Sequence, residues 1–309
     1  MIAMVEDQGT LFNPRTYKGQ KPLVYSVVPA TAEQTVLQTI PAYRLYLSNI
    51  GVSEYTPDDY AGDIKLLGNY TQNRPLSALQ ANDLRQWIES LKGKMADTTI
   101  SRKKSALANY FNWLVSERVL ATNPAQGMRG TRVTSPAPDL LYDSECDELL
   151  AANSNDPRTY LLILLLLETG MKKAELMALD VTHFDFSDKY QPVVWIKHSG
   201  KKTSKDRKLK LPVHKVPIVP VFEDYVERYK VTGLLFPYTE RFINNLLADA
   251  SMRAKLRMRA TASMLRDICV VRGVRRGEKL ETMLERIGLE KNSYDDARKK
   301  YGRLLSEAL

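Results

Sequence analysis

Residues 160–176 read YLLILLLLETGMKKAEL, which joins an uninterrupted apolar run to two adjacent lysines. The run at 161–167 must be buried, and it is far shorter than the roughly 20 residues that cross a bilayer. Gly170 permits a turn, and Lys172 and Lys173 follow it. Positive charge placed at the end of a core segment indicates that this end of the core faces an anion, and we expect a phosphate.

Length and composition indicate an ordinary globular protein. The 309 residues suffice for two domains, and 44% are hydrophobic and 26% charged. The first residues, MIAMVEDQGT, do not resemble a signal peptide, and Cys146 and Cys269 show neither metal spacing nor a disulfide framework. Only three histidines occur, which argues against a metal site. We therefore expect a cytoplasmic protein with no cofactor and no membrane association.

The distribution of charge is more informative than its total. The chain has 45 Lys+Arg against 36 Asp+Glu, a net charge of +9. Residues 196–215 carry eight Lys/Arg and one acid, and residues 253–276 carry the same numbers. Two dense basic blocks in one half of a mixed-charge chain predict a surface for a polyanion. The alternative is a pair of solvated faces that only improve solubility.

The first part of the chain is expected to be helical after a flexible arm at residues 1–31. Thr56 and Pro57 begin a helix, because Ser, Thr and Asp cap helices and Pro fits the first helical position. Residues 32–127 form the predicted helical domain, and 128–139, with two prolines, form a linker. The predicted helices lie within 32–50, from 56 to about 73–75, at 82–93 and at 97–124.

The second predicted domain spans residues 140–309. It is mainly helical, with a small antiparallel sheet made by strands at 193–200 and 206–212 around the tip KKTSK. No phosphate-binding glycine motif and no HExxH motif occurs. The predicted helices are 144–152, 157–168, a short one from 173, and about 219–230, 239–250, 261–272, 279–287 and 294–306.

Cations from separate parts of this domain are expected to converge. Lys172 and Lys173 begin a helix, Arg266 lies on an otherwise apolar helix turn, and three lysines occupy the hairpin tip. Preorganised cations stabilise the charge that develops on a phosphodiester during displacement. Tyr301, near the end of the chain, is a possible nucleophile that needs no metal. The hairpin lysines are Lys201, Lys202 and Lys205.

These features resemble the tyrosine recombinases, the phage integrase family, over about residues 34–306. TGMKKAEL resembles the T-G-(L/M)-R-x-x-E-L box, and HSGKKTSKDRKLKLP resembles the G-K-x-x-K-x-R-x-(V/L)-P hairpin. SMLRD resembles H-x-L-R-H, and ERIGLEKNSYDDARKKY resembles the terminal L-G-H…Y segment. The resemblance implies a mainly α protein, with a four-helix SAM-like core-binding domain followed by an α+β catalytic domain.

Carried over residue by residue, the resemblance implies an incomplete catalytic set. The first arginine falls on Lys172, which keeps the charge but cannot form a bidentate fork on phosphate. The second arginine is present as Arg266, and the lysine that the family uses as general acid falls on Lys201. The three histidines of the family fall on Ser263, Asp267 and Leu289.

The nucleophile best matches Tyr301, although it lies a few residues beyond the usual position. Arg298 stands nearer that position, and Tyr294 comes too early. Tyr301 can also be read as a packing residue on an amphipathic terminal helix. The lysines at 172 and 173 can likewise be read as counterions of Glu168 and Glu175.

The resemblance implies that the protein binds double-stranded DNA and self-associates on it as a dimer or tetramer. If active, it cuts and rejoins strands through a 3′-phosphotyrosyl intermediate at Tyr301. The alternatives are a catalytically inactive DNA-binding regulator or architectural protein, and a binder of another polyanion such as RNA. The residues predicted to contact DNA are Arg102, Lys103, Lys104, Lys173, Lys202, Lys205 and Arg207.

Overall fold

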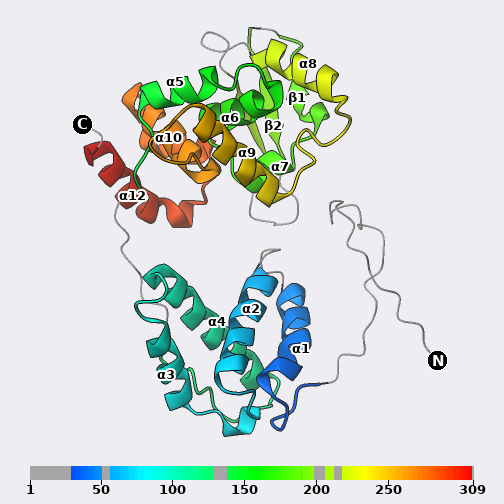
Figure 1. Ribbon diagram of the computed structural model, residues 1–309, viewed down its shortest axis with the longest axis vertical. Coiled ribbons are helices and arrows are strands. Elements are labelled where there is room, and N and C mark those ends of the chain that lie inside the picture. The colour runs from blue at the N-terminus through cyan, green and yellow to red at the C-terminus, as the bar shows by residue number, and fades with distance from the viewer. Residues whose placement is uncertain are drawn as a thin grey trace, which may run out of the picture. The chain divides into compact units, whose positions relative to one another are not determined.

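The computed structural model describes residues 29–50, 56–128, 138–188, 190–197, 206–211 and 218–307 (Figure 1). These residues form two compact units, one within 29–128 and the other within 138–307. Each unit has its own hydrophobic core. The predicted arm at 1–31 and linker at 128–139 lie almost wholly outside the described residues, so the predicted domain boundaries stay predictions.

The N-terminal unit contains four α-helices, as predicted. The helix predicted to run to residue 124 ends at Ser116, and this part of the prediction was wrong. Arg118 adopts a left-handed φ of 58°, and the amides of Val119 and Leu120 then bond to the carbonyl of Leu114. The chain therefore folds back and packs these two side chains on the core instead of continuing the helix. The helices are α1 (Val36–Asn49), α2 (Thr56–Tyr70), α3 (Ala81–Leu91) and α4 (Asp97–Ser116).

The C-terminal unit is helical with one small sheet, which confirms the predicted fold class. Most predicted helices agree with the structure to within a few residues. The observed helices are α5 (Asp143–Ala151), α6 (Pro157–Thr169), α7 (Lys173–Met177), α8 (Ile218–Tyr229), α9 (Glu240–Arg253), α10 (Ala262–Arg275), α11 (Leu280–Arg286) and α12 (Tyr294–Glu307).

The sheet has three antiparallel strands in the order β1-β2-β3. The predicted pair is present as β2 (Val193–Ile196) and β3 (Arg207–Lys210), with Val194 opposite Leu209. The additional strand β1 (Phe184–Asp185) pairs with β2. Two residues are too few to show an alternating pattern, so the sequence carried no signal for β1. The hairpin tip lies outside the described residues.

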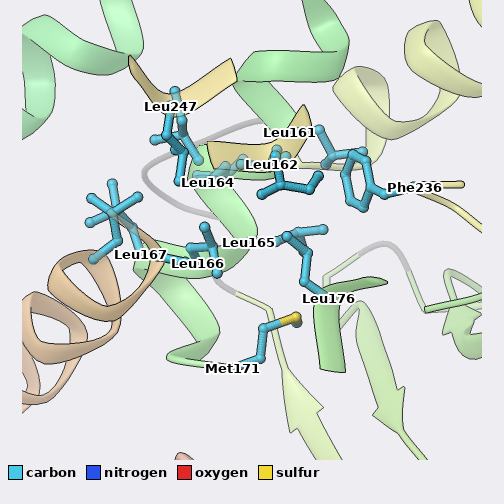
Figure 2. Close-up of a cluster of buried hydrophobic side chains, with 14 of the residues drawn as sticks. Leu161, Leu162, Leu164, Leu165, Leu166, Leu167, Met171, Leu176, Phe236 and Leu247 are labelled. Carbon is cyan, nitrogen blue, oxygen red and sulfur yellow. The ribbon is translucent and has the colours of Figure 1, made fainter. Parts of the chain in front are cut away.

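Helix α6 is the centre of the C-terminal unit. Asp156 caps its first turn through the Arg158 amide, Pro157 occupies the first helical position, and Gly170 ends the helix at a φ of 61°. Residues 161–166 are fully buried. Figure 2 shows the leucines of this helix meeting Leu247 of α9 and Phe236 at different points. A helix that is apolar all round must be covered all round, and here α5, α7, α8, α9 and α10 contact it.

The described residues contain neither a membrane-spanning helix nor a metal-binding cluster. None of their helices combines the length and the apolar character needed to cross a membrane. They also hold no group of three or more His, Cys, Asp or Glu side chains that could bind a metal ion.

Candidate functional site

The turn between α6 and α7 presents the first cation. Gly170 takes the left-handed conformation, and Lys172 then caps α7 with its amide donating to Glu175 Oε2 at 2.8 Å. The Lys172 side chain is exposed, whereas Glu175 is buried. The carboxylate therefore fixes the backbone of the turn and leaves the lysine free to face solvent.

Arg266 on α10 binds the same turn from the other side. Its Nη1 donates to the carbonyl oxygen of Gly170 at 2.6 Å. Burial lowers the pKa of Arg266, with the nearby Glu175 opposing the shift, and the guanidinium stays charged at neutral pH. Arg266 thus lies against the segment that carries Lys172, so the structure brings these two predicted site residues together. Ser263 is exposed in the first turn of α10, where the helix N-terminus favours an anion.

Arg207 of β3 joins the sheet to this turn. Its two terminal nitrogens donate to the two oxygens of Glu175, at 3.1 and 2.9 Å. Only 10% of the Arg207 side chain and 6% of the Glu175 side chain are exposed. Burial alone would raise the pKa of Glu175, but the bonds from Arg207 and the Lys172 amide hold that pKa below its ordinary value. In this conformation Arg207 stabilises the site and is not presented to DNA.

Gly288 leaves the space that the Arg207 guanidinium occupies. It follows α11 with a φ of 66°, and a Cβ at this position would lie 1.9 Å from Arg207 Nη1. A glycine is therefore required both for the backbone conformation and for space. The next residue, Leu289, packs against the apolar cluster that contains Ile287 and Tyr301. It has no acid–base group.

Tyr301 lies on α12 and is almost sealed from solvent, with 3% of its surface exposed. Its hydroxyl donates to Asp267 Oδ1 at 2.8 Å. The two oxygens of Asp267 also accept from Lys300 Nζ at 2.7 and 2.6 Å. Burial, and then the Asp267 carboxylate, raise the pKa of the Tyr301 phenol. The tyrosine is thus both a packing residue and a member of a buried polar network beside Arg266.

Lys300 was missed by the sequence reasoning. It stands next to Tyr301 in a run of basic residues, and nothing in the spacing of that run singles it out. Arg298, which stands nearer the family's tyrosine position, is on the surface and forms ion pairs with Glu281 and Asp295. It cannot act as a nucleophile. The predicted hairpin lysines Lys201, Lys202 and Lys205 lie outside the described residues.

The predicted DNA contacts on α4 differ sharply in exposure. Lys103 is 2% exposed, and its ammonium lies 2.5 Å from Asp63 of α2. Arg102 shares Asp63 but leaves 40% of its side chain in solvent, and Lys104 is half-buried. In the C-terminal unit, Lys173 is paired with Glu240 at 2.7 Å. Lys103 is therefore a structural residue in this conformation, while Arg102 and Lys104 remain open to a ligand.

Most arginines of the basic block at 253–276 bind other groups of the same unit. Arg257 binds the carboxylate of Asp139 and the carbonyl of Leu140, and Arg272 binds Asp143. Further bonds join Arg257 to Glu145, Arg253 to Asn153, Arg259 to the carbonyl of Asn244, and Arg266 to Gly170. This block therefore contributes less accessible charge than its composition predicts.

Comparisons with known proteins agree with this architecture. A family model described as the phage integrase N-terminal SAM-like domain matches residues 40–118. A second, described as the phage integrase family, matches residues 139–293. That match ends before α12 and does not include Tyr301, so the role of Tyr301 stays a prediction.

The individual relatives named here are less than 30% identical to this chain. A tyrosine recombinase of Pseudothermotoga lettingae is 29% identical over 174 residues, which are 55% of this chain and 59% of that protein. The solved XerH site-specific recombinase bound to difH substrate has a TM-score of 0.70 and 14% identity, covering 91% of this chain and 97% of that one. The lambda integrase dimer bound to a COC′ core site has a TM-score of 0.67 and 14% identity, covering 84% and 97%.

Proposed function

The chain belongs to the phage integrase family of tyrosine recombinases, and on that premise we propose that it binds duplex DNA and cleaves a strand through Tyr301. The observation that carries this proposal is that Arg266 bonds to the turn that carries Lys172, while the next residue of α10, Asp267, accepts from the Tyr301 hydroxyl. Two cations and a hydroxyl nucleophile are the parts that phosphoryl transfer needs.

Each residue would take a distinct role. The Tyr301 hydroxyl gives its proton to water as its oxygen attacks the scissile phosphorus, the bond from phosphorus to the 5′ oxygen breaks, and a 3′-phosphotyrosyl link remains. Lys172 and Arg266 neutralise the non-bridging oxygens, and Ser263 donates a hydrogen bond to one of them. Lys201 donates a proton to the departing 5′ oxygen. Attack by the free 5′ hydroxyl of another strand reverses these steps and rejoins the DNA.

DNA contacts outside the reaction centre would come from both units. Arg102 and Lys104 in the first half of α4 have accessible side chains, and Lys173, 24% exposed, would exchange its partner Glu240 for a phosphate. Lys202 and Lys205 of the hairpin tip add contacts to the backbone. We exclude Lys103 and Arg207 from these contacts, because both are buried against carboxylates. Self-association on DNA, as a dimer or tetramer, is part of the proposal, and the lambda integrase complex named above is a dimer on DNA.

A second candidate is a DNA-binding regulator that does not cut. It is favoured by the sealed Tyr301 and by Ser263 and Leu289, which stand where the family has histidines. Losing a positioned general acid or base slows a reaction by about 10²–10⁴, and losing a preorganised donor by about 10²–10³. Such losses are not additive, and together they predict slow cleavage.

The experiment that separates the two candidates uses a duplex with a nick near the cleavage point, so that the cut strand is lost by diffusion. The recombinase proposal predicts a covalent protein–DNA adduct on a denaturing gel that Tyr301→Phe abolishes. A companion variant, Lys172→Arg with Ser263→His, should increase the adduct. Retained DNA binding with no adduct from either protein would instead establish the non-cutting candidate.

A further inference from the structure

The position of Tyr301 poses a physical problem for the proposed reaction. A nucleophile has to touch the phosphorus, yet this phenol is 3% exposed and lies among the side chains of Cys269, Ile287 and Leu304. Its hydroxyl is already engaged as a donor to Asp267. In the described conformation the tyrosine therefore cannot reach a DNA phosphate, and something has to hold it there and release it.

Asp267 has the contacts expected of an internal substitute for a phosphate. It is an anion, 3% exposed, that accepts hydrogen bonds from Tyr301 and from the Lys300 ammonium. It is also the residue after Arg266, whose guanidinium lies close enough for the two charges to interact. A phosphodiester arriving at Arg266 would compete with Asp267 for the same cations.

Lys300 is the point at which such competition can begin. Its side chain is 40% exposed, whereas that of its partner Asp267 is 4% exposed. The ammonium is thus accessible to an anion from solvent while the carboxylate is not. Removing Lys300 would leave the buried Asp267 carboxylate with less compensating charge, which is unfavourable. Capture of Lys300 by phosphate would therefore destabilise the whole Asp267–Lys300–Tyr301 network.

We propose that Asp267 is a positioning residue that holds Tyr301 in a resting position, and that a DNA phosphate releases the tyrosine by taking Lys300 from Asp267. The inference rests on the proposed function, in which Tyr301 attacks the phosphate. It predicts that loss of either partner frees the tyrosine, because Asp267 holds Tyr301 directly and Lys300 compensates the charge of Asp267.

The first experiment needs no DNA and no catalysis. Wild-type protein and Asp267→Ala are treated with N-acetylimidazole, and acetylation of each tyrosine is followed by mass spectrometry. Tyr301 should be protected in the wild type and should react roughly 10- to 100-fold faster in the variant, the range expected for one hydrogen bond to a charged group. Tyr225, fully buried in the same unit, should stay protected and so reports that the unit remains folded.

Two further variants make the result specific. Asp267→Asn keeps the shape and removes only the charge, so it should also increase the reactivity of Tyr301. Asp63→Asn disrupts a buried carboxylate–lysine pair of the same kind in the N-terminal unit and should leave Tyr301 protected. If Tyr301 stays protected in both Asp267 variants, the inference is wrong.

The second experiment measures the covalent adduct on the nicked duplex in a single turnover. Asp267→Ala should form it faster than the wild type, and Lys300→Met, which takes the cation from Asp267 without DNA, should make Tyr301 reactive to acetylation. A slower adduct in Asp267→Ala with an accessible Tyr301 would identify Asp267 as the proton acceptor and overturn the inference. Protection of Tyr301 at the wild-type level in Lys300→Met would overturn the role of Lys300. An accessible Tyr301 without adduct in any protein would uphold the resting position and contradict the proposed cleavage.

Discussion

Two glycines determine how closely the site can assemble. Gly170 ends α6 and offers its carbonyl to Arg266, and an added Cβ there would lie 2.5 Å from Ile287. Gly288 stands against Arg207 in the same way. Both are part of the boxes that resemble the family, so the sequence indicated where glycines matter. It did not indicate that each one makes room for a side chain from another element, because that depends on the packing of distant segments.

Gly288→Ala should destabilise the protein more than a positive φ alone explains. Forcing a left-handed conformation on alanine costs about 1–2 kcal/mol, and the clash with Arg207 should add about 1–3 kcal/mol. Gly277→Ala is the matched control, since Gly277 has a φ of 91° and nothing within 4 Å of a Cβ. Urea unfolding of the two variants measures the difference. Equal losses would mean that Arg207 moves aside freely.

Glu175→Gln should lower the free energy of unfolding by about 2 kcal/mol at neutral pH, because Arg207 loses a buried anionic partner. The folded-state pKa of Glu175 is lowered, so its stabilising contribution is full above the ordinary glutamate pKa and fades as the pH falls through the lowered value. The gap between wild type and variant should therefore narrow in acid. Urea unfolding over a pH series checks this, and a gap that widens toward low pH would contradict it.

Helix α4 shows that the position of a lysine on a helix decides whether its side chain is buried or accessible. Lys103 is three residues after Ile100 and four before Leu107, which places it on the buried face of the helix. The sequence alone contained this spacing. The cluster of three basic residues favoured a surface role for Lys103 instead, and that prediction was followed. The partner Asp63, which lies on α2, could not be inferred because pairing across helices depends on how they pack.

Lys103→Ala and Lys104→Ala should therefore behave differently. Lys103→Ala leaves Asp63 buried with less compensation and should destabilise the N-terminal unit by about 3 kcal/mol. Lys104→Ala should leave stability unchanged and reduce the salt dependence of DNA binding by about one phosphate contact. Thermal unfolding and DNA titration separate the two effects. If the two variants lost DNA affinity equally at unchanged stability, the buried pair would have to be a feature that opens on binding.

The helix and strand pattern was largely predictable, whereas the end of α4 and strand β1 were not. Long periodic segments such as α6 carry their own signal, because an apolar run bounded by a capped start and a glycine has few alternatives. The early end of α4 depends on Val119 and Leu120 packing back on the core, which competes with helix propensity and wins. The hydrogen bond from Tyr301 to Asp267 likewise could not be predicted from the sequence, because it depends on how α12 packs against α10.

At the scale of the whole molecule, the basic residues fall into two groups. Some hold segments of the fold together, and others stay accessible to a ligand. The block at 253–276 serves mainly to tie α9 and α10 to neighbouring segments, whereas Lys172, Arg102 and Lys104 keep accessible side chains. Net charge alone therefore overstates the DNA-binding surface. The units each bury a core of their own, so each can present its accessible cations to a duplex.

The most direct test of the claim that these cations face a DNA backbone is the salt dependence of binding to a random-sequence duplex, followed by fluorescence anisotropy. Each phosphate neutralised contributes about −0.9 to the slope of log affinity against log salt concentration. With contacts from both units, we predict a slope of about −4 or steeper. A slope near zero would contradict the account, because it would mean that no lysine or arginine displaces counterions from DNA.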